Sequence, residues 1–161
     1  MSEPLSKSEL IIPQFGSSQQ IILPLGGIKT AESRLPESKM VNPATYSELE
    51  FTMNEGYREA RKNISVLGYE LAKAEKALRE AKSIAILDEY PAFLKEKDMK
   101  DNAQVRDAFL ERQPNFVAAQ DRIDMLKAMI DLMEGKIKVF ENVCRYMKVE
   151  MKLIERSGVI D

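Results

Sequence analysis

The chain falls into two parts that differ in their pattern of hydrophobic and polar residues. Residues 1–41 hold short aliphatic clusters separated by proline, glycine and serine, whereas apolar residues after Asn42 recur every three or four positions over long stretches. A spacing of three and four places side chains on one face of a helix, so the second part is expected to be helical. The change falls at Asn42–Pro43, because asparagine suits a helix N-cap and proline suits the first helical turn.

The first long helix is expected to begin at Asn42–Pro43 and to run to about Pro91, because no further proline interrupts the chain between these two prolines. Its stripe holds many small residues, which allow a neighbouring helix to approach closely. The apolar or small positions of the stripe are Tyr46, Leu49, Met53, Gly56, Tyr57, Ala60, Ile64, Leu67, Leu71, Ala74, Leu78, Ala81 and Ala85.

Residues 91–113 are expected to form a short helical elbow, at whose start Pro91 ends the first helix or opens a new turn. Asp98–Asn102 is polar and indicates a loop, and Asp101 is expected to cap a brief helix because Gln104 lies three residues further on. Pro114 then breaks or kinks the chain before the last helix.

The last helix has the most regular pattern. From Phe116 to Ile154 apolar residues alternate between spacings of four and three, which is typical of a coiled-coil seam. A second apolar stripe runs beside this seam, and one partner helix covers only one of them, so we expect a homo-oligomer. The alternative is a monomer in which the elbow helix and the N-terminal arm cover the second stripe. The residues expected in the core and oligomer seams are Ile130, Ile137, Phe140, Met147, Met129, Leu132 and Val143.

These patterns predict an all-α protein, in which residues 42–158 form a long antiparallel, coiled-coil-like helical hairpin with a short elbow. Residues 1–41 are expected to form an extended or flexible N-terminal arm, because five of the seven prolines lie within residues 1–43. The alternative for this arm is a hairpin packed on its own domain, since Leu10–Ile12 and Ile21–Leu23 are each followed by a proline, as in short edge strands.

The composition argues against catalysis. The chain has no histidine and a single cysteine, Cys144, so the commonest general base and transition-metal ligand are missing. Gly26–Gly27 has no lysine directly after its second glycine, and no helix is expected to follow it as in a phosphate-binding loop; the last helix lacks the Glu-x-x-His pairs of a di-iron bundle. We therefore expect no enzyme activity, no metal and no cofactor.

The cysteine content and the length of the aliphatic runs indicate the expected cellular compartment. One cysteine fits a reducing compartment, and prolines and glycines interrupt the N-terminal aliphatic stretches before they reach the length of a signal peptide or membrane span. A cytoplasmic protein without membrane contact is expected.

Local groups of basic residues are the remaining candidates for a binding site. The net charge of −2 gives no general attraction to nucleic acid, so such binding depends on a local patch. Repeated around an oligomer, a basic helix face would bind a phosphate backbone in a salt-dependent way, although mixed Lys/Glu faces more often serve solvation and ion pairing. The candidate nucleic-acid-binding residues are Lys73, Lys76, Arg79, Lys82, Arg145, Lys148 and Lys152.

Several segments between residues 44 and 156 follow the layout of a known family. They are Tyr46-x-x-Leu49, the Ala/Lys/Glu-rich stretch Leu71–Leu78 that leads to Leu87–Tyr90, the elbow stretch Val105–Ala108, and the long last helix. This layout resembles the UvsY-type recombination mediators of bacteriophages. The resemblance implies a ring-like homo-oligomer that binds single-stranded DNA and helps to load a recombinase onto strands coated by single-strand-binding protein.

The same resemblance points to DNA-contacting basic residues toward the end of the first long helix. The matching positions here are Lys73, Lys76, Arg79 and Lys82. The chain departs from the family at Ile84–Ile86, where basic residues would be expected, and in its long N-terminal arm.

Two functions therefore stay open. The first is an oligomeric accessory protein that binds single-stranded DNA and assists recombinase loading in the cytoplasm of a phage-infected host. The second is a non-enzymatic structural or adaptor protein, for example a phage virion component, that captures a protein partner through the N-terminal arm. A phage-encoded inhibitor of a host factor would have the same composition.

Overall fold

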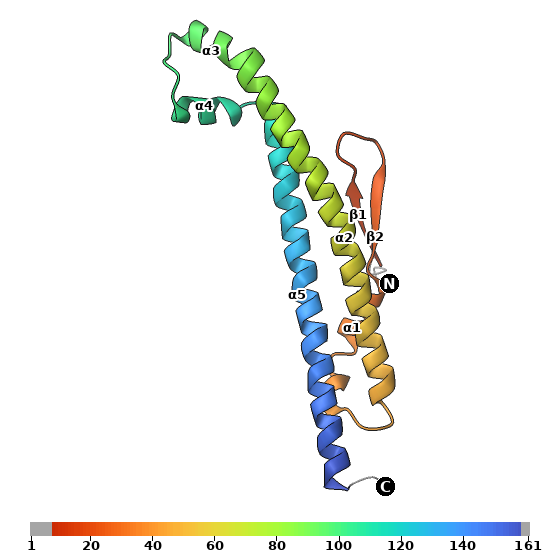
Figure 1. Ribbon diagram of the computed structural model, residues 1–161. Helices are drawn as coiled ribbons and strands as arrows, with labels where there is room; N and C mark the ends of the chain where they lie inside the picture. The colour runs from red at the N-terminus through yellow and green to blue at the C-terminus, as the bar shows by residue number, and fades with distance from the viewer. Residues whose placement is uncertain (1–7, 159–161) are drawn as a thin grey trace, which may run out of the picture. The chain divides into compact units, whose positions relative to one another are not determined.

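The computed structural model describes residues 8–158, which are mostly helical with one small sheet (Figure 1). In chain order the elements are β1 (Glu9–Pro13), β2 (Gln20–Pro24), α1 (Gly26–Ser33), the 3-10 turn η1 (Glu37–Met40), α2 (Tyr46–Ile84), the π-helical turn η2 (Ala85–Glu89), α3 (Tyr90–Lys97), α4 (Ala103–Leu110) and α5 (Pro114–Ser157). The two long helices of 39 and 44 residues confirm the helical prediction from the three-and-four spacing, while the sheet makes an all-α description approximate.

The chain divides into two compact units, and α2 and α5 each contribute to both. Unit 1 comprises Met1–Val66 and Asp131–Asp161, and unit 2 comprises Leu67–Ile130. The boundary expected between residues 41 and 42 lies inside unit 1. Each unit is described by itself.

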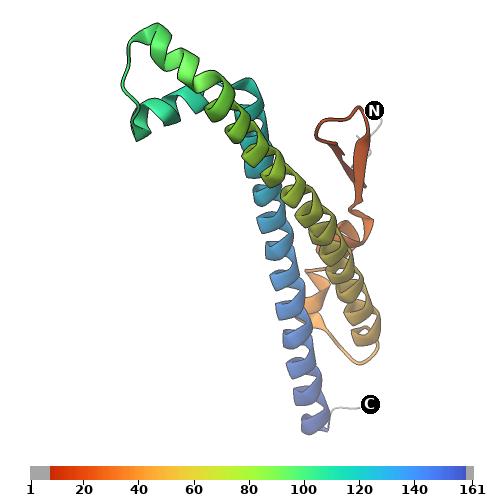
Figure 2. The same ribbon diagram turned by 45° about the horizontal axis from the view of Figure 1, so that its top comes forward.

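In unit 1, α2 and α5 run antiparallel and side by side (Figures 1 and 2). Glu50 of α2 pairs with Lys148 of α5 at 3.3 Å, while Gly56, further along α2, lies against Phe140, which is earlier in α5. The apolar stripes expected on α2 and α5 face each other in unit 1, since residues of both stripes are buried there. These buried residues include Leu49, Met53, Ala60, Met133, Ile137, Phe140 and Met147.

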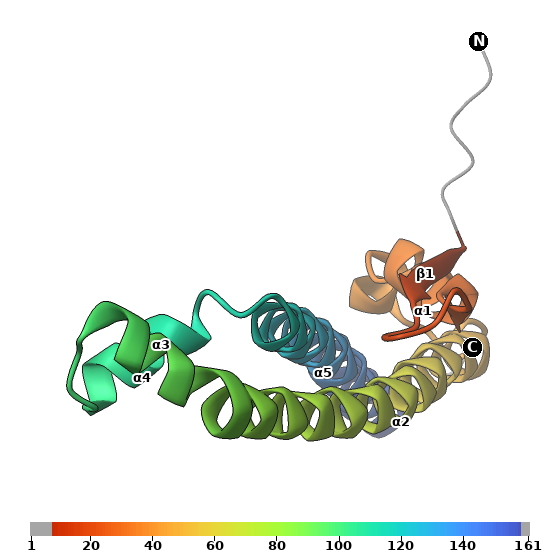
Figure 3. The same cartoon turned by 90° about the horizontal axis from the view of Figure 1, so that it is seen from above.

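The N-terminal segment differs from the extended or flexible arm that the prolines suggested. Residues 9–40 form the β1–β2 hairpin, α1 and η1, and Figure 3 shows the hairpin and α1 alongside the first part of α2. Ile12 and Leu23 are 1% exposed, and Ile28 and Ala31 are also buried. The alternative of a hairpin packed on its own domain therefore describes residues 9–40, because these aliphatic side chains supply the apolar surface that the composition seemed to lack.

The hairpin register explains how proline and aliphatic residues coexist in this segment. β1 and β2 pair antiparallel, with Ile11 opposite Ile22 and Ile12 opposite Ile21, and Pro13 and Pro24 stand at strand ends where a missing N–H is tolerated. Beyond the strands, Asn63 Nδ2 of α2 donates a hydrogen bond to the Pro24 carbonyl at 2.8 Å. The backbone N–H of Ile28 donates to Glu59 Oε2 at 2.8 Å, so α2 holds both the hairpin and α1.

In unit 2, the later part of α2 and the earlier part of α5 are also antiparallel, with Glu70 of α2 near Arg122 of α5. The expected elbow is helical, and Figure 3 shows α3 and α4 close together. Ala85, Tyr90, Phe109 and Leu110 form its buried cluster. Their ring contacts include a 5.2 Å centroid distance between Tyr90 and Phe109.

The elbow follows the sequence prediction at Pro91 and differs from it at Asp101. Pro91 opens a new helical turn, the second of its two expected roles, because it lies in the first turn of α3, directly after η2. Asp101 does not cap α4, because Asn102 is the N-cap and its side chain accepts from the Val105 N–H at 2.9 Å. Asp101 instead accepts hydrogen bonds from Tyr90 and Arg106, which link α4 to the start of α3.

The residues expected in the core and oligomer seams differ in exposure. Ile137, Phe140 and Met147 are buried, Met129, Ile130 and Val143 are half-buried, and Leu132 is 57% exposed. Between residues 8 and 158, none of the helices combines the length and the apolar character needed to cross a bilayer.

Candidate nucleic-acid interface

The first group of predicted basic residues lies on α2 in unit 2. Lys76, Arg79 and Lys82 are exposed, and Lys73 is half-buried. Each lies three residues after the one before, so the row turns by about 60° around α2 at each step and runs diagonally across the exposed side of the helix. Lys73 pairs with Glu70 at 2.9 Å and Lys76 with Glu80 at 3.8 Å, whereas Arg79 and Lys82 form no ion pair within residues 8–158. We call Lys73, Lys76, Arg79 and Lys82 the α2 basic face.

Glu70 anchors one end of this face from inside the unit. Its side chain is 7% exposed and its Oε2 lies 3.8 Å from Nη2 of Arg122, which is equally buried. Glu70 Oε2 and Arg122 Nη2 have no hydrogen-bond partner among the described residues, so the pair depends on charge attraction rather than on a hydrogen bond. Since Glu70 also accepts from Lys73, the buried pair fixes where the lysine emerges at the surface.

An aromatic residue that the sequence reasoning did not single out lies on the same face. Tyr69 is 67% exposed, and Lys73 Nζ lies 5.2 Å from its ring centroid. An exposed aromatic ring next to a cation is a combination that single-strand-binding surfaces use, because a base stacks on the ring while cations hold the phosphates. The signal in the sequence was the four-residue spacing between Tyr69 and Lys73.

The second group of predicted basic residues lies on α5 in unit 1. Arg145, Lys148 and Lys152 are all exposed. Lys148 pairs with Glu50, while Arg145 and Lys152 have no ion-pair partner in the described part of the chain. Two of these three cations are therefore free to meet an external anion.

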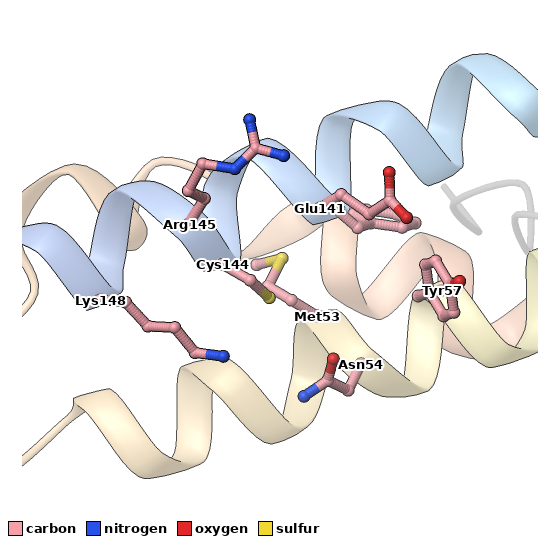
Figure 4. A pocket seen from close by; sticks show the side chains of 8 residues that line it. Met53, Asn54, Tyr57, Glu141, Cys144, Arg145 and Lys148 are labelled. Atoms are coloured by element: carbon pink, nitrogen blue, oxygen red, sulfur yellow. The ribbon is translucent and has the colours of Figure 1, made fainter.

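Arg145 and Lys148 stand at the edge of a cavity of about 420 Å³ between α2 and α5. Figure 4 shows both side chains projecting from α5, Asn54 and Tyr57 from α2, and Met53 and Cys144 between the helices. The Tyr57 hydroxyl accepts from Arg61 Nε at 3.2 Å, and the Arg61 guanidinium lies 5.5 Å from the Tyr57 ring centroid. The cavity thus combines an aromatic ring with cations.

Two ionisable side chains near Glu50, Cys144 and Tyr46, stay protonated at pH 7. Burial, assisted by the nearby Glu50, raises the pKa of the Cys144 thiol, although Lys148 opposes this shift. A thiol kept protonated is a poor nucleophile. Burial and a hydrogen bond to Glu50 raise the pKa of Tyr46 to about 12. Neither group is therefore poised for catalysis.

The seven predicted residues are divided between the two units. The α2 basic face lies in unit 2, and Arg145, Lys148 and Lys152 lie in unit 1. Within residues 8–158, histidine, cysteine, aspartate and glutamate side chains form no group of three or more that could hold a metal ion.

Comparisons with protein-family models, curated proteins and solved structures found no match for this chain.

Proposed function

We propose that the protein is a non-enzymatic, oligomeric accessory protein that binds single-stranded DNA through the α2 basic face. Its role in this proposal follows the UvsY-type mediators that the sequence layout resembles, in which strand binding assists the loading of a recombinase onto strands coated by single-strand-binding protein. The observation that carries the proposal is the α2 basic face itself, where exposed Arg79 and Lys82 lack carboxylate partners among the described residues and Lys73 lies 5.2 Å from the exposed ring of Tyr69.

The chemistry of a single strand fits this surface. Cations along a helix neutralise successive phosphates and release condensed counterions, while the unpaired bases offer flat faces to an aromatic ring. A stacked base contributes about 1–3 kcal/mol, which a duplex would not offer because its bases are already stacked. The surface is therefore suited to single strands without sequence preference.

A second candidate function rests on the outer face of the β1–β2 hairpin. Ile11 and Ile22 stand opposite each other in the register and are 49% and 55% exposed. An exposed pair of aliphatic side chains on the face of the hairpin suits packing against an apolar surface of a protein partner, and the outer edges of a two-stranded sheet suit strand addition. This adaptor function would use the hairpin as a folded element rather than as a flexible arm.

Charge reversal on the α2 basic face tests the leading proposal. The double variant Arg79→Glu/Lys82→Glu is expected to weaken binding of a labelled single-stranded oligonucleotide at least tenfold at low salt, because two phosphate contacts are lost and two repulsive charges are added. Fluorescence anisotropy measures the affinity.

The matched control is Lys95→Glu/Lys100→Glu, which changes the net charge equally at exposed positions of the same unit but outside the α2 basic face. It should bind almost as well as the parent protein. Equal losses in both variants would show a general charge effect and would refute a specific role for this face. Unimpaired binding by Arg79→Glu/Lys82→Glu would have the same consequence.

A further inference from the structure

An exposed apolar stripe runs along α5 within unit 1. Seven positions follow one another at alternating spacings of three and four, and none of them carries a charge. All seven residues are exposed to solvent. The exposed fraction is 57% for Leu132 and 52% for both Val149 and Leu153. We call these positions the α5 outer stripe. They are Leu132, Gly135, Val139, Asn142, Tyr146, Val149 and Leu153.

The α5 outer stripe is separate from the seam that α5 buries within unit 1. At 3.6 residues per turn it lies on nearly the opposite face from Ile137, Phe140 and Met147, which are the buried positions. It extends over about 32 Å at 1.5 Å per residue. The segment Leu35–Lys39 borders only one side of it, across a predominantly apolar groove of about 520 Å³ that Val139 and Tyr146 help to line. A long uncharged stripe with coiled-coil spacing is typical of a helix that packs against another helix.

We infer that the α5 outer stripe is covered by the same stripe of a second copy of this chain, with the two α5 helices parallel and in register. The charges that flank the stripe support this occupant. In two parallel, in-register helices that meet along this stripe, a residue on one flank of the stripe lies close to a residue on the other flank of the second copy. The second of these residues is five positions later in the sequence. Asp131 then faces Lys136 of the second copy, and Arg145 faces Glu150 of the second copy, so both pairs attract.

The antiparallel arrangement is disfavoured by the same flanks. It would place one flank of each helix against the same flank of the other. When the two stripes overlap fully, Lys138 would then face Arg145 of the second copy and these like charges repel, while Asp131 would face Lys152. The parallel arrangement brings no like charges of the two flanks together. The parallel arrangement also places Asn142, the one amide in the stripe, opposite its own copy, where the two amides form a hydrogen bond that fixes the register.

This inference rests on the oligomeric part of the proposed function and names the surface that makes the oligomer. The inference requires Lys136 to approach Asp131 of the second copy. Its side chain is accessible for this contact, because it remains 31% exposed while it is paired with Glu32 of α1. The α2 basic face takes no part in the stripe, so loss of the dimer and loss of strand binding are separable.

Disulfide trapping tests the contact and its direction in the full chain. Each cysteine is introduced singly into a Cys144→Ala background, and dimer formation after mild oxidation is followed on a non-reducing gel. Val149→Cys is expected to form a covalent dimer in most of the protein, because in-register helices bring position 149 against itself. The control Glu134→Cys is exposed on another face of α5 and should stay monomeric under the same conditions.

Other outcomes contradict the inference. Trapping only in a mixture of Val149→Cys with Gly135→Cys would show antiparallel helices, and equal trapping of Val149→Cys and Glu134→Cys would show random collision. Gly135 has open space around a built Cβ, so its cysteine variant introduces no clash.

Sedimentation provides a second readout without cysteines. Arg145→Glu should weaken the dimer at least tenfold through repulsion from Glu150 of the second copy, and Arg145→Glu/Glu150→Arg should restore it. A monomeric parent protein at concentrations where its circular dichroism shows full folding would overturn the inference. This result would leave the strand-binding proposal to its own anisotropy test.

Discussion

At the residue scale, Gly56 is the point of α2 where space is most limited. A Cβ at this position would lie 2.7 Å from the Ala31 Cβ of α1 and 3.0 Å from Phe140 Cε2 of α5. Contacts this short force at least one neighbour to move. Glycine therefore allows α1 and α5 to pack against the same turn of α2, at the cost of a less favourable helix residue.

Gly56→Ala should accordingly lower the free energy of unfolding by about 1–2 kcal/mol, because the strain of an extra methyl group outweighs the gain in helix propensity. Denaturant unfolding followed by circular dichroism measures the change. Gly68→Ala is the matched control on the same helix, since nothing lies within 4 Å of its built Cβ. It should raise stability by up to about 1 kcal/mol. If Gly56→Ala is as stable as Gly68→Ala, the close approach at Gly56 is wrong.

At the element scale, periodicity predicted the long helices because each helical turn repeats the same pattern of apolar and polar residues. Apolar residues such as Leu49, Met53 and Ala60 mark the buried face of α2 independently of its partner. The elbow was harder to place. Asp101 and Asn102 are both good N-cap residues, and the backbone rather than the residue type decided which one caps α4.

The structure of the N-terminal elements could not be predicted from the local pattern of apolar and polar residues. Strands of five residues carry few alternations, and the contacts that hold them span many positions, as between Asn63 and the Pro24 carbonyl. Proline and glycine content described the turns of this segment correctly but gave no information about its burial. Non-local packing therefore determined whether the segment was an arm or part of unit 1.

Adjacent residues of β1 test this packing. Ile12→Asp should lower the free energy of unfolding by about 3 kcal/mol or more, because it puts a charge at a position that is 1% exposed. Ile11→Asp points to the outer face, where Ile11 is 49% exposed, and should change stability by less than about 1 kcal/mol. Thermal or denaturant unfolding compares the two variants. Equal small effects would mean that the hairpin is not packed on unit 1.

At the scale of the whole molecule, the exposure of the basic residues was easier to predict from the sequence than their ion-pair partners. Helical spacing alone placed Lys76, Arg79 and Lys82 on the surface of α2. The buried pair of Glu70 and Arg122 was not foreseen, because charged residues are rarely buried and neither residue interrupts the helical pattern. Their pairing depends on α2 and α5 coming together, which no local pattern records.

The proposed function joins two surfaces with different physical requirements. Strand binding through the α2 basic face depends on charge and is weakened by salt, whereas the contact proposed for the α5 outer stripe is mainly apolar and persists in salt. A rise in salt should therefore release DNA while the oligomer remains. This difference would separate the proposed binding surface from the proposed assembly surface within one protein.

The most direct measurement is the affinity of the parent protein for a labelled single-stranded oligonucleotide, determined by anisotropy at a series of salt concentrations with the oligomer mass recorded at each. We expect tight binding at low salt, and a linear fall of the logarithm of the binding constant with the logarithm of salt concentration, with a slope of about −0.7 for each phosphate contacted. The oligomer mass should stay constant over the series. Absence of binding at low salt, at protein concentrations where the oligomer is formed, would contradict the account and turn attention to the outer face of the β1–β2 hairpin.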